Sequence, residues 1–330
     1  MTFNTKNAGY IICCFALSLA LGISTFMSLV SVGVIAEYER DHPKSNVTQS
    51  VDNAPVTDND TFLDNYSDEQ IMVDDDGVTS VIIVGDGQSS DDGTDAVVEI
   101  TATDIVEIYA ELMNGAKERA PAFKKIEYQV LPDDPENRVI TEGEDAVNSV
   151  MGVIMDLGVF VPEDQARANP YYHTKGDGDM SLFPVFNMPK GSYLTDPNGI
   201  KSYVYEELDN GNVKIKFMLV SEDNPEPVAE GSDIAPSYTG AVFSPMSKAK
   251  IDRTINHPII GVFAQNISYS LRYHDCYVEF EYNPETMELV SLSHIVYVTI
   301  KGSGDVGLVG KMNVEKQELE SYVYINEFEY

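Results

Sequence analysis

From Asn266 to Tyr330, apolar and polar side chains alternate, and this alternation constrains the possible fold more than any other feature of the sequence. A period of two is that of a β-strand with one face against a core and the other toward water. Turn-forming residues interrupt the alternation at Asn283–Thr286 and at Gly302–Asp305. The sequence therefore predicts an antiparallel meander at this end of the chain.

Helical spacing precedes the meander. Residues 101–120 place their apolar side chains on one side of a helix, which Thr101 or Thr103 can cap. Further helices are predicted at 144–160, 162–170 and 244–255, and strands at 78–87, 122–132 and in a hairpin at 201–220 whose turn is Asp209–Gly211. Helices beside antiparallel strands predict an α+β domain over residues 101–330, with helices packed on one face of a curved antiparallel meander.

A long apolar run near the N-terminus contains no charged side chain from Ile11 to Ala36. A secretory signal needs an apolar stretch of roughly 7–15 residues, whereas a membrane span needs roughly 20. The run is therefore predicted to be a retained transmembrane helix, with residues 1–10 as a short cytoplasmic segment because Lys6 precedes it and acidic residues follow it. The alternative is a signal peptide that is cleaved after Ala36, which would leave a secreted protein.

Residues 37–100 are strongly acidic and poor in apolar side chains, and 17 of the 54 acidic residues lie between Glu37 and Glu99. Such a composition does not bury enough surface to offset chain entropy, so an acidic disordered spacer is predicted here. The whole chain has a formal net charge of −33. An acidic surface repels phosphate backbones, and nucleic acid is therefore excluded as an expected partner.

Cysteine and histidine come into phase in the predicted meander. Cys13 and Cys14 lie in the apolar run, and Cys276 is the third and last cysteine, so no disulfide is expected within the domain. If Tyr282 pairs with Glu288, Cys276 lies opposite His294 on the buried side of the hairpin. A thiol beside an imidazole is the beginning of a nucleophilic dyad, although no third member is evident and buried packing explains both residues.

A phase change occurs just before that pair. Apolar side chains occupy odd positions up to Tyr273 and even positions from Cys276 onward. The change predicts a β-bulge near His274 and Asp275, which can re-aim the imidazole.

Ser247 and Lys250 match the S-x-x-K pattern, in which a lysine one helical turn away activates a serine. The other elements that accompany this pattern in penicillin-binding proteins are missing. The acidic clusters at Asp74–Gly77 and Gly176–Asp179 lack the alternating ligands and closing glutamate of a calcium loop. No metal site and no cofactor are expected.

These features together predict a membrane-tethered extracytoplasmic binding or interaction module at the cell envelope. Its expected ligand is a protein or an envelope polymer, and it contacts the membrane through residues 11–36. One alternative is an envelope hydrolase that uses Cys276 with His294 or Ser247 with Lys250. A second alternative is a structural assembly subunit. A binding role is favoured over an enzyme because no complete catalytic set is visible.

Overall fold

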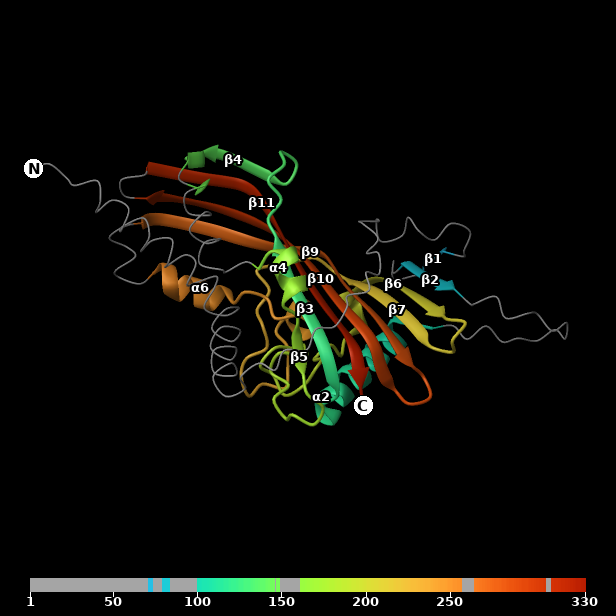
Figure 1. The fold of residues 1–330 in the computed structure, drawn as a ribbon. Helices are drawn as coiled ribbons and strands as arrows, with labels where there is room; N and C mark the ends of the chain where they lie inside the picture. Colours follow the sequence, from blue (N-terminus) through green and yellow to red (C-terminus); the bar gives the residue numbers. More distant parts are fainter. Residues whose placement is uncertain are drawn as a thin grey trace, which may run out of the picture.

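The computed structural model describes residues 71–73, 79–83, 100–145, 147–148, 161–256, 264–306 and 310–330. The expectations for the apolar run, for most of the acidic spacer and for most of the helix at 144–160 therefore lie outside the described residues. The described part combines helices with a largely antiparallel sheet, as Figure 1 shows, so the α+β class is confirmed.

One sheet runs through the whole described part, in the order β1-β2-β6-β7-β9-β10-β11-β3-β5, with β4 paired to β11 and β8 paired to β9. All pairings are antiparallel except that of β2 with β6. The strands are β1 (Ile71–Val73), β2 (Thr79–Ile83), β3 (Ala122–Val130), β4 (Arg138–Glu142), β5 (Tyr171–His173), β6 (Ile200–Glu207), β7 (Val213–Leu219), β8 (Glu222–Asp223), β9 (Ala264–Asn283), β10 (Glu288–Val306) and β11 (Gly310–Glu329).

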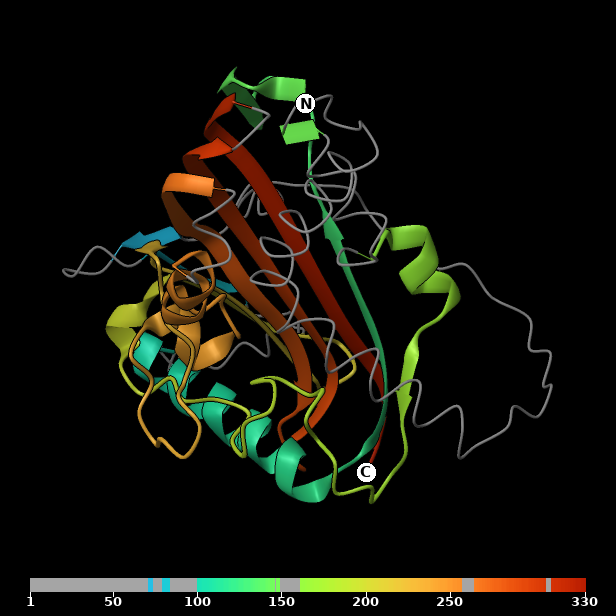
Figure 2. The ribbon, with the colours of Figure 1, turned by 90° about the vertical axis from the view of Figure 1, so that its left-hand side faces the viewer.

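Three long strands form the centre of the sheet and confirm the predicted meander. β9, β10 and β11 contain 20, 19 and 20 residues, and Figure 2 shows them curving side by side. The predicted turn at Asn283–Thr286 is confirmed, because β9 ends at Asn283 and β10 begins at Glu288. The predicted turn at Gly302–Asp305 is wrong. Those residues belong to β10. The strand continues through them, and its pairing register shifts beside the two glycines.

Helices α2 and α6 lie on one side of the long strands, α2 near the C-terminus of the chain and α6 toward the opposite end (Figures 1 and 2). The helical elements are α2 (Ala102–Arg119), α4 (Glu163–Ala168), the 3-10 turn η1 (Pro197–Gly199), α5 (Tyr238–Val242) and α6 (Lys248–Ile255). Thr101 caps α2 as predicted: its side chain accepts from the backbone of Asp104, whose carboxylate in turn accepts from the backbone of Thr101. The predicted helix at 244–255 begins only at Lys248.

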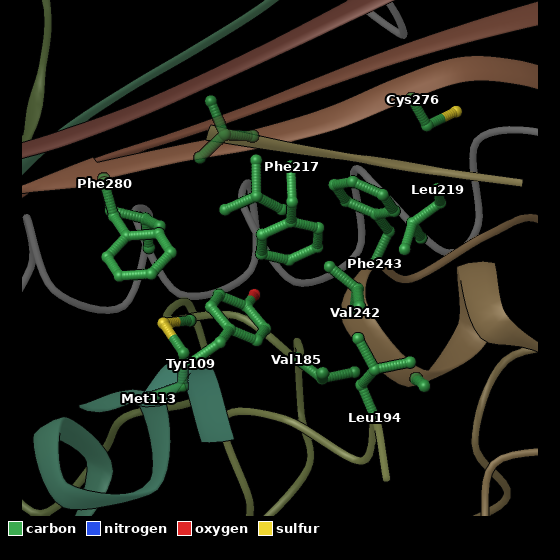
Figure 3. Close-up of a cluster of buried hydrophobic side chains, with 14 of the residues drawn as sticks. Tyr109, Met113, Val185, Leu194, Phe217, Leu219, Val242, Phe243, Cys276 and Phe280 are labelled. Carbon is green, nitrogen blue, oxygen red and sulfur yellow. The ribbon is translucent and has the colours of Figure 1, made fainter. Parts of the chain in front are cut away.

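The core lies between α2 and the face of the sheet that α2 covers, which we call the inner face. Figure 3 shows Tyr109 and Met113 from α2 beneath Phe217 of β7 and Phe280 of β9. All four side chains are fully buried, and the Tyr109 ring meets that of Phe217 edge to face at 5.1 Å. Alternate residues of the long strands point to the opposite, outer face.

Candidate functional site

A pocket opens on the inner face between the long strands, β3 and the loop that contains Pro184. Its cavity measures about 70 Å³. Most of the lining is apolar: Pro184, Phe186, Phe243, Pro245, Met246, Val296, Val298, Leu319 and Val323. Polar atoms come from Glu127, Gln129, Tyr273, Ser244, His294 and Ser321. An apolar concavity with a few placed polar groups is the usual form of a small-ligand site.

Buried cations fix the loop that forms one wall of this pocket. The Lys117 ammonium, at the end of α2, donates to the carbonyls of Val185 at 2.7 Å and Met188 at 2.5 Å. The Lys125 ammonium donates to the Leu182 carbonyl at 3.1 Å. Burial lowers the pKa of Lys117 to about 7, although nearby Asp179 opposes the change. The wall is therefore tied to both α2 and β3, which preorganises the pocket.

The acidic group of the pocket is already paired on one side. Lys125 lies 2.6 Å from Glu127 Oε2 and stands over the Phe186 ring at 4.1 Å from its centroid. Lys125 is 5 % exposed, whereas the Glu127 side chain is 25 % exposed at the mouth. Glu127 therefore compensates the buried charge of Lys125, and its carboxylate remains available to a ligand in the pocket.

His294 lines the pocket and is held by aromatic neighbours. Its Nε2 atom lies 3.0 Å from the Tyr109 hydroxyl, and the Phe243 ring meets the imidazole edge to face at 5.0 Å. Burial, with a smaller contribution from Lys125, lowers the pKa of His294 to about 3. The imidazole is therefore neutral at physiological pH and acts here as a hydrogen-bonding member of the core.

The predicted pairing of Cys276 with His294 is wrong in register. His294 pairs with Val278, so the cysteine and the histidine share the inner face but are offset along the strands. The thiol instead approaches the carbonyls of His274 at 3.4 Å and Tyr297 at 3.7 Å. Burial raises the pKa of Cys276 to about 12, so the side chain is a thiol near neutral pH.

Two shifts explain the register error: Glu288 pairs with Asn283 instead of Tyr282, and a bulge follows early in β10. Leu289 pairs with Tyr282 and Ser291 pairs with Glu281, which leaves Val290 unpaired between them and 39 % exposed. The bulge lets both Leu289 and Leu292 point inward, which strict alternation forbids.

Ser247 and Lys250 do not form an activated pair in the structure. The Ser247 hydroxyl donates to Glu226 Oε2 at 2.7 Å, and its oxygen accepts from the backbone N–H of Lys250 at 3.3 Å. Glu226 also accepts from the backbone of Ala249. These contacts satisfy the free N–H groups at the start of α6, so Ser247 is a helix cap.

The predicted bulge near His274 is confirmed, and it builds a polar cluster on the outer face. The pairing shifts between Ile295 and Tyr297, and Asp275 adopts a positive φ of 48°. His274 Nδ1 lies 2.9 Å from Asp275 Oδ2, and its Nε2 lies 3.1 Å from both Thr299 Oγ1 and Glu318 Oε2. The sequence indicated the bulge but not the contacts across strands.

The hydroxyl of Thr299, the imidazole of His274 and the carboxylate of Asp275 resemble a hydrolytic triad. They differ from one in the group to which the hydroxyl donates its hydrogen bond. The Thr299 hydroxyl donates to Glu318 Oε1 at 2.6 Å. In a catalytic triad the hydroxyl donates to the imidazole, which removes its proton during attack. Thr299 is also in the middle of β10 and paired on both sides. The cluster therefore connects β9, β10 and β11 across the bulge.

Within the described ranges, no group of three histidine, cysteine or acidic side chains is arranged to hold a metal ion. The same residues include no helix with the length and apolar character of a membrane span. No protein-family model, no curated protein and no solved structure matches the chain.

Proposed function

We propose that the protein is a membrane-tethered extracytoplasmic binding module that holds an apolar group of a protein or envelope polymer in the inner-face pocket. The observation that carries this proposal is the pocket itself, with an apolar lining, a fixed wall and one carboxylate edge at Glu127. Binding requires only shape and placed polar groups. The protonated Cys276 and the capping role of Ser247 give the hydrolase alternative no support.

The size of the pocket defines the group that it takes. A cavity of roughly 150 Å³ holds benzene in another protein, and about 70 Å³ is less than half of that. We therefore expect the tip of a branched aliphatic group to enter, while the rest of the ligand lies in the open mouth beside Glu127. Aromatic rings are expected to bind more weakly.

The membrane tether rests on the uncharged run Ile11–Ala36 and on the acidic composition of residues 37–100. Mass spectrometry of the mature protein tests it: we expect the N-terminal peptide to include residues before the run. A mature chain that begins at Glu37 would show a cleaved signal peptide and a secreted module.

A pair of serine variants tests the pocket in the full-length chain. Ser321 lines the pocket, whereas Ser293 on the neighbouring strand pairs with Tyr324 and Glu279 and points to the outer face. The probes are N-acetyl-leucinamide and N-acetyl-phenylalaninamide, followed by ligand-detected NMR. We expect the leucine probe to bind better, and Ser321→Phe to abolish its binding while Ser293→Phe does not. Equal binding in both variants, or none in the unmodified protein, would overturn the proposal.

A further inference from the structure

We propose that the outer face of the sheet binds an arginine-rich segment of a partner protein. The site is the tyrosine face, a set of five rings on four neighbouring strands: Tyr128, Tyr277, Tyr297, Tyr322 and Tyr324. It lies on the opposite side of the sheet from the pocket, because Ser321 and Val296 line the pocket while the residues next to them in sequence point outward. It therefore stands independently of the pocket.

Three of the five rings, Tyr128, Tyr322 and Tyr324, contact one another. The Tyr128 ring stacks on that of Tyr322 with 4.8 Å between centroids, and Tyr322 stacks on Tyr324 at 6.4 Å. Ile295 pairs with both Tyr277 and Tyr322 and is only 3 % exposed, so the rings close over it. Tyr297, Tyr322 and Tyr324 remain partly exposed. Rigid tyrosines of this kind supply contact area at low entropy cost.

The chain's own cations show how the two ends of this surface bind positive charge. At the β7 side, Lys216 Nζ stands 4.5 Å from the centroid of Tyr277. At the β3 side, the Arg167 guanidinium stands 5.8 Å from the centroid of Tyr128. Among the residues that the structure describes, no lysine or arginine stands over the three rings between these ends, although the His274 imidazole stacks on the Tyr297 ring at 6.2 Å. The centre of the face therefore repeats a cation-binding arrangement whose cation is not supplied by the described chain.

Charge favours a basic occupant over a neutral one. The Tyr322 hydroxyl donates a hydrogen bond to Glu320 Oε2 at 2.6 Å, and Glu279 of β9 flanks the rings on the other side. The chain carries 54 acidic residues against 21 basic ones, so its field attracts a cationic segment before contact. Arginine suits this surface better than lysine because its planar guanidinium stacks on a ring and binds a carboxylate at the same time.

The competing explanation is that the tyrosines only shield Ile295. Leucine at the same positions also covers an apolar residue, whereas only an aromatic ring attracts a cation. Replacing tyrosine by leucine and by phenylalanine therefore separates the two roles without changing the charge of the protein. The unchanged charge is essential, since a strongly acidic chain attracts any polycation unspecifically.

The experiment measures binding of a fluorescent Gly-Arg repeat peptide to the full-length chain at physiological salt, with Gly-Lys and Gly-Glu repeats for comparison. We expect the arginine repeat to bind more tightly than the lysine repeat and the glutamate repeat not to bind. The double variant Tyr297→Leu/Tyr324→Leu should weaken the arginine repeat roughly tenfold, and Tyr297→Phe/Tyr324→Phe should restore most of the affinity.

The control is Tyr172→Leu, which removes a 60 % exposed tyrosine on the edge strand β5, outside the five rings. It should leave the affinity unchanged, as should Ser321→Phe, which fills the pocket on the other face. Thermal melting identifies any variant that fails to fold, and the phenylalanine variant then carries the comparison. Equal affinity of the unmodified and leucine proteins would overturn the proposal. So would a neutral glycan fragment that binds the tyrosine face where the arginine repeat does not.

Discussion

The inner and outer faces of the long sheet are made by the same strands, yet they differ in how deeply their aromatic side chains are buried. In β11, Val323 and Ile325 point inward and are buried, while Tyr322 and Tyr324 between and before them point outward and keep a hydroxyl near water. On the inner face, the rings of Phe217 and Phe280 are fully buried. The difference teaches that the inner face supplies stability, whereas the outer face keeps large rings at a surface where they can recognise a partner.

The largest expected effect sharpens this comparison directly. Phe280→Ala removes a fully buried ring that packs against Tyr109 at 5.7 Å, and should lower the unfolding free energy by about 4 kcal/mol. Tyr324→Ala on the outer face should cost clearly less, since its site opens to solvent and leaves no closed cavity. Chemical denaturation of the two variants measures both values. Equal losses would contradict the division of roles between the faces.

A second prediction uses the neutral histidine of the inner face. The folded pKa of His294 is about 3, below its ordinary value of 6.5, so between these values the unfolded chain binds a proton that the folded chain does not. The contribution of His294 to the unfolding free energy should therefore fall as pH is lowered through 6.5, by up to about 1.4 kcal/mol per pH unit, and stay level above it.

The variant His294→Gln should remove this dependence while it keeps a polar group beside Tyr109. Denaturation of both proteins between pH 7 and pH 5, given as the difference between them, separates His294 from the many carboxylates. The outer-face His274→Gln is the matched control. Parallel pH profiles for the unmodified protein and His294→Gln would show that the imidazole is not held neutral.

The smallest expected effect concerns the inner-face thiol. Cys276→Ala removes one small buried atom and should cost on the order of 1 kcal/mol. Because burial raises its pKa to about 12, the thiol should react slowly with iodoacetamide in the folded protein and quickly after denaturation. Peptide mass spectrometry separates it from Cys13 and Cys14. Rapid labelling in the folded state would place Cys276 in an accessible site and return the nucleophile hypothesis to consideration.

Local patterns predicted the elements well where neighbouring residues determine them. The hairpin of β6 and β7 follows from its turn, in which Leu208 and Asn212 close the loop through a 2.9 Å hydrogen bond between backbone atoms. The hairpin of β9 and β10 was placed correctly but in the wrong register. Glu288 pairs with Asn283 instead of Tyr282, and the bulge at Val290 shifts the register once more, so that Leu289 and Leu292 are both buried.

The sequence predicted less of the candidate site than of the strands, because the site also depends on packing between distant segments. The pocket combines β3, β10, β11 and the loop around Pro184, and only the fold brings these segments together. His294 was identified as buried and in phase with its strand, but its partner Tyr109 lies on a helix far away in sequence. No spacing rule connects Lys117 and Lys125 to the carbonyls of a loop that has no periodic pattern.

The pairing of β3 with β11 has a consequence for the order of assembly. Tyr128 pairs with Tyr322, so β3, which is synthesised early, can pair fully only after β11, one of the last segments of the chain, has been made. Until β11 arrives, the only described partner of β3 is the three-residue β5. Closing so distant a contact is entropically slow and leaves unpaired strand edges exposed in the meantime. Folding should therefore be limited by a late step, in which docking of β11 completes the sheet and creates both the pocket and the tyrosine face at once.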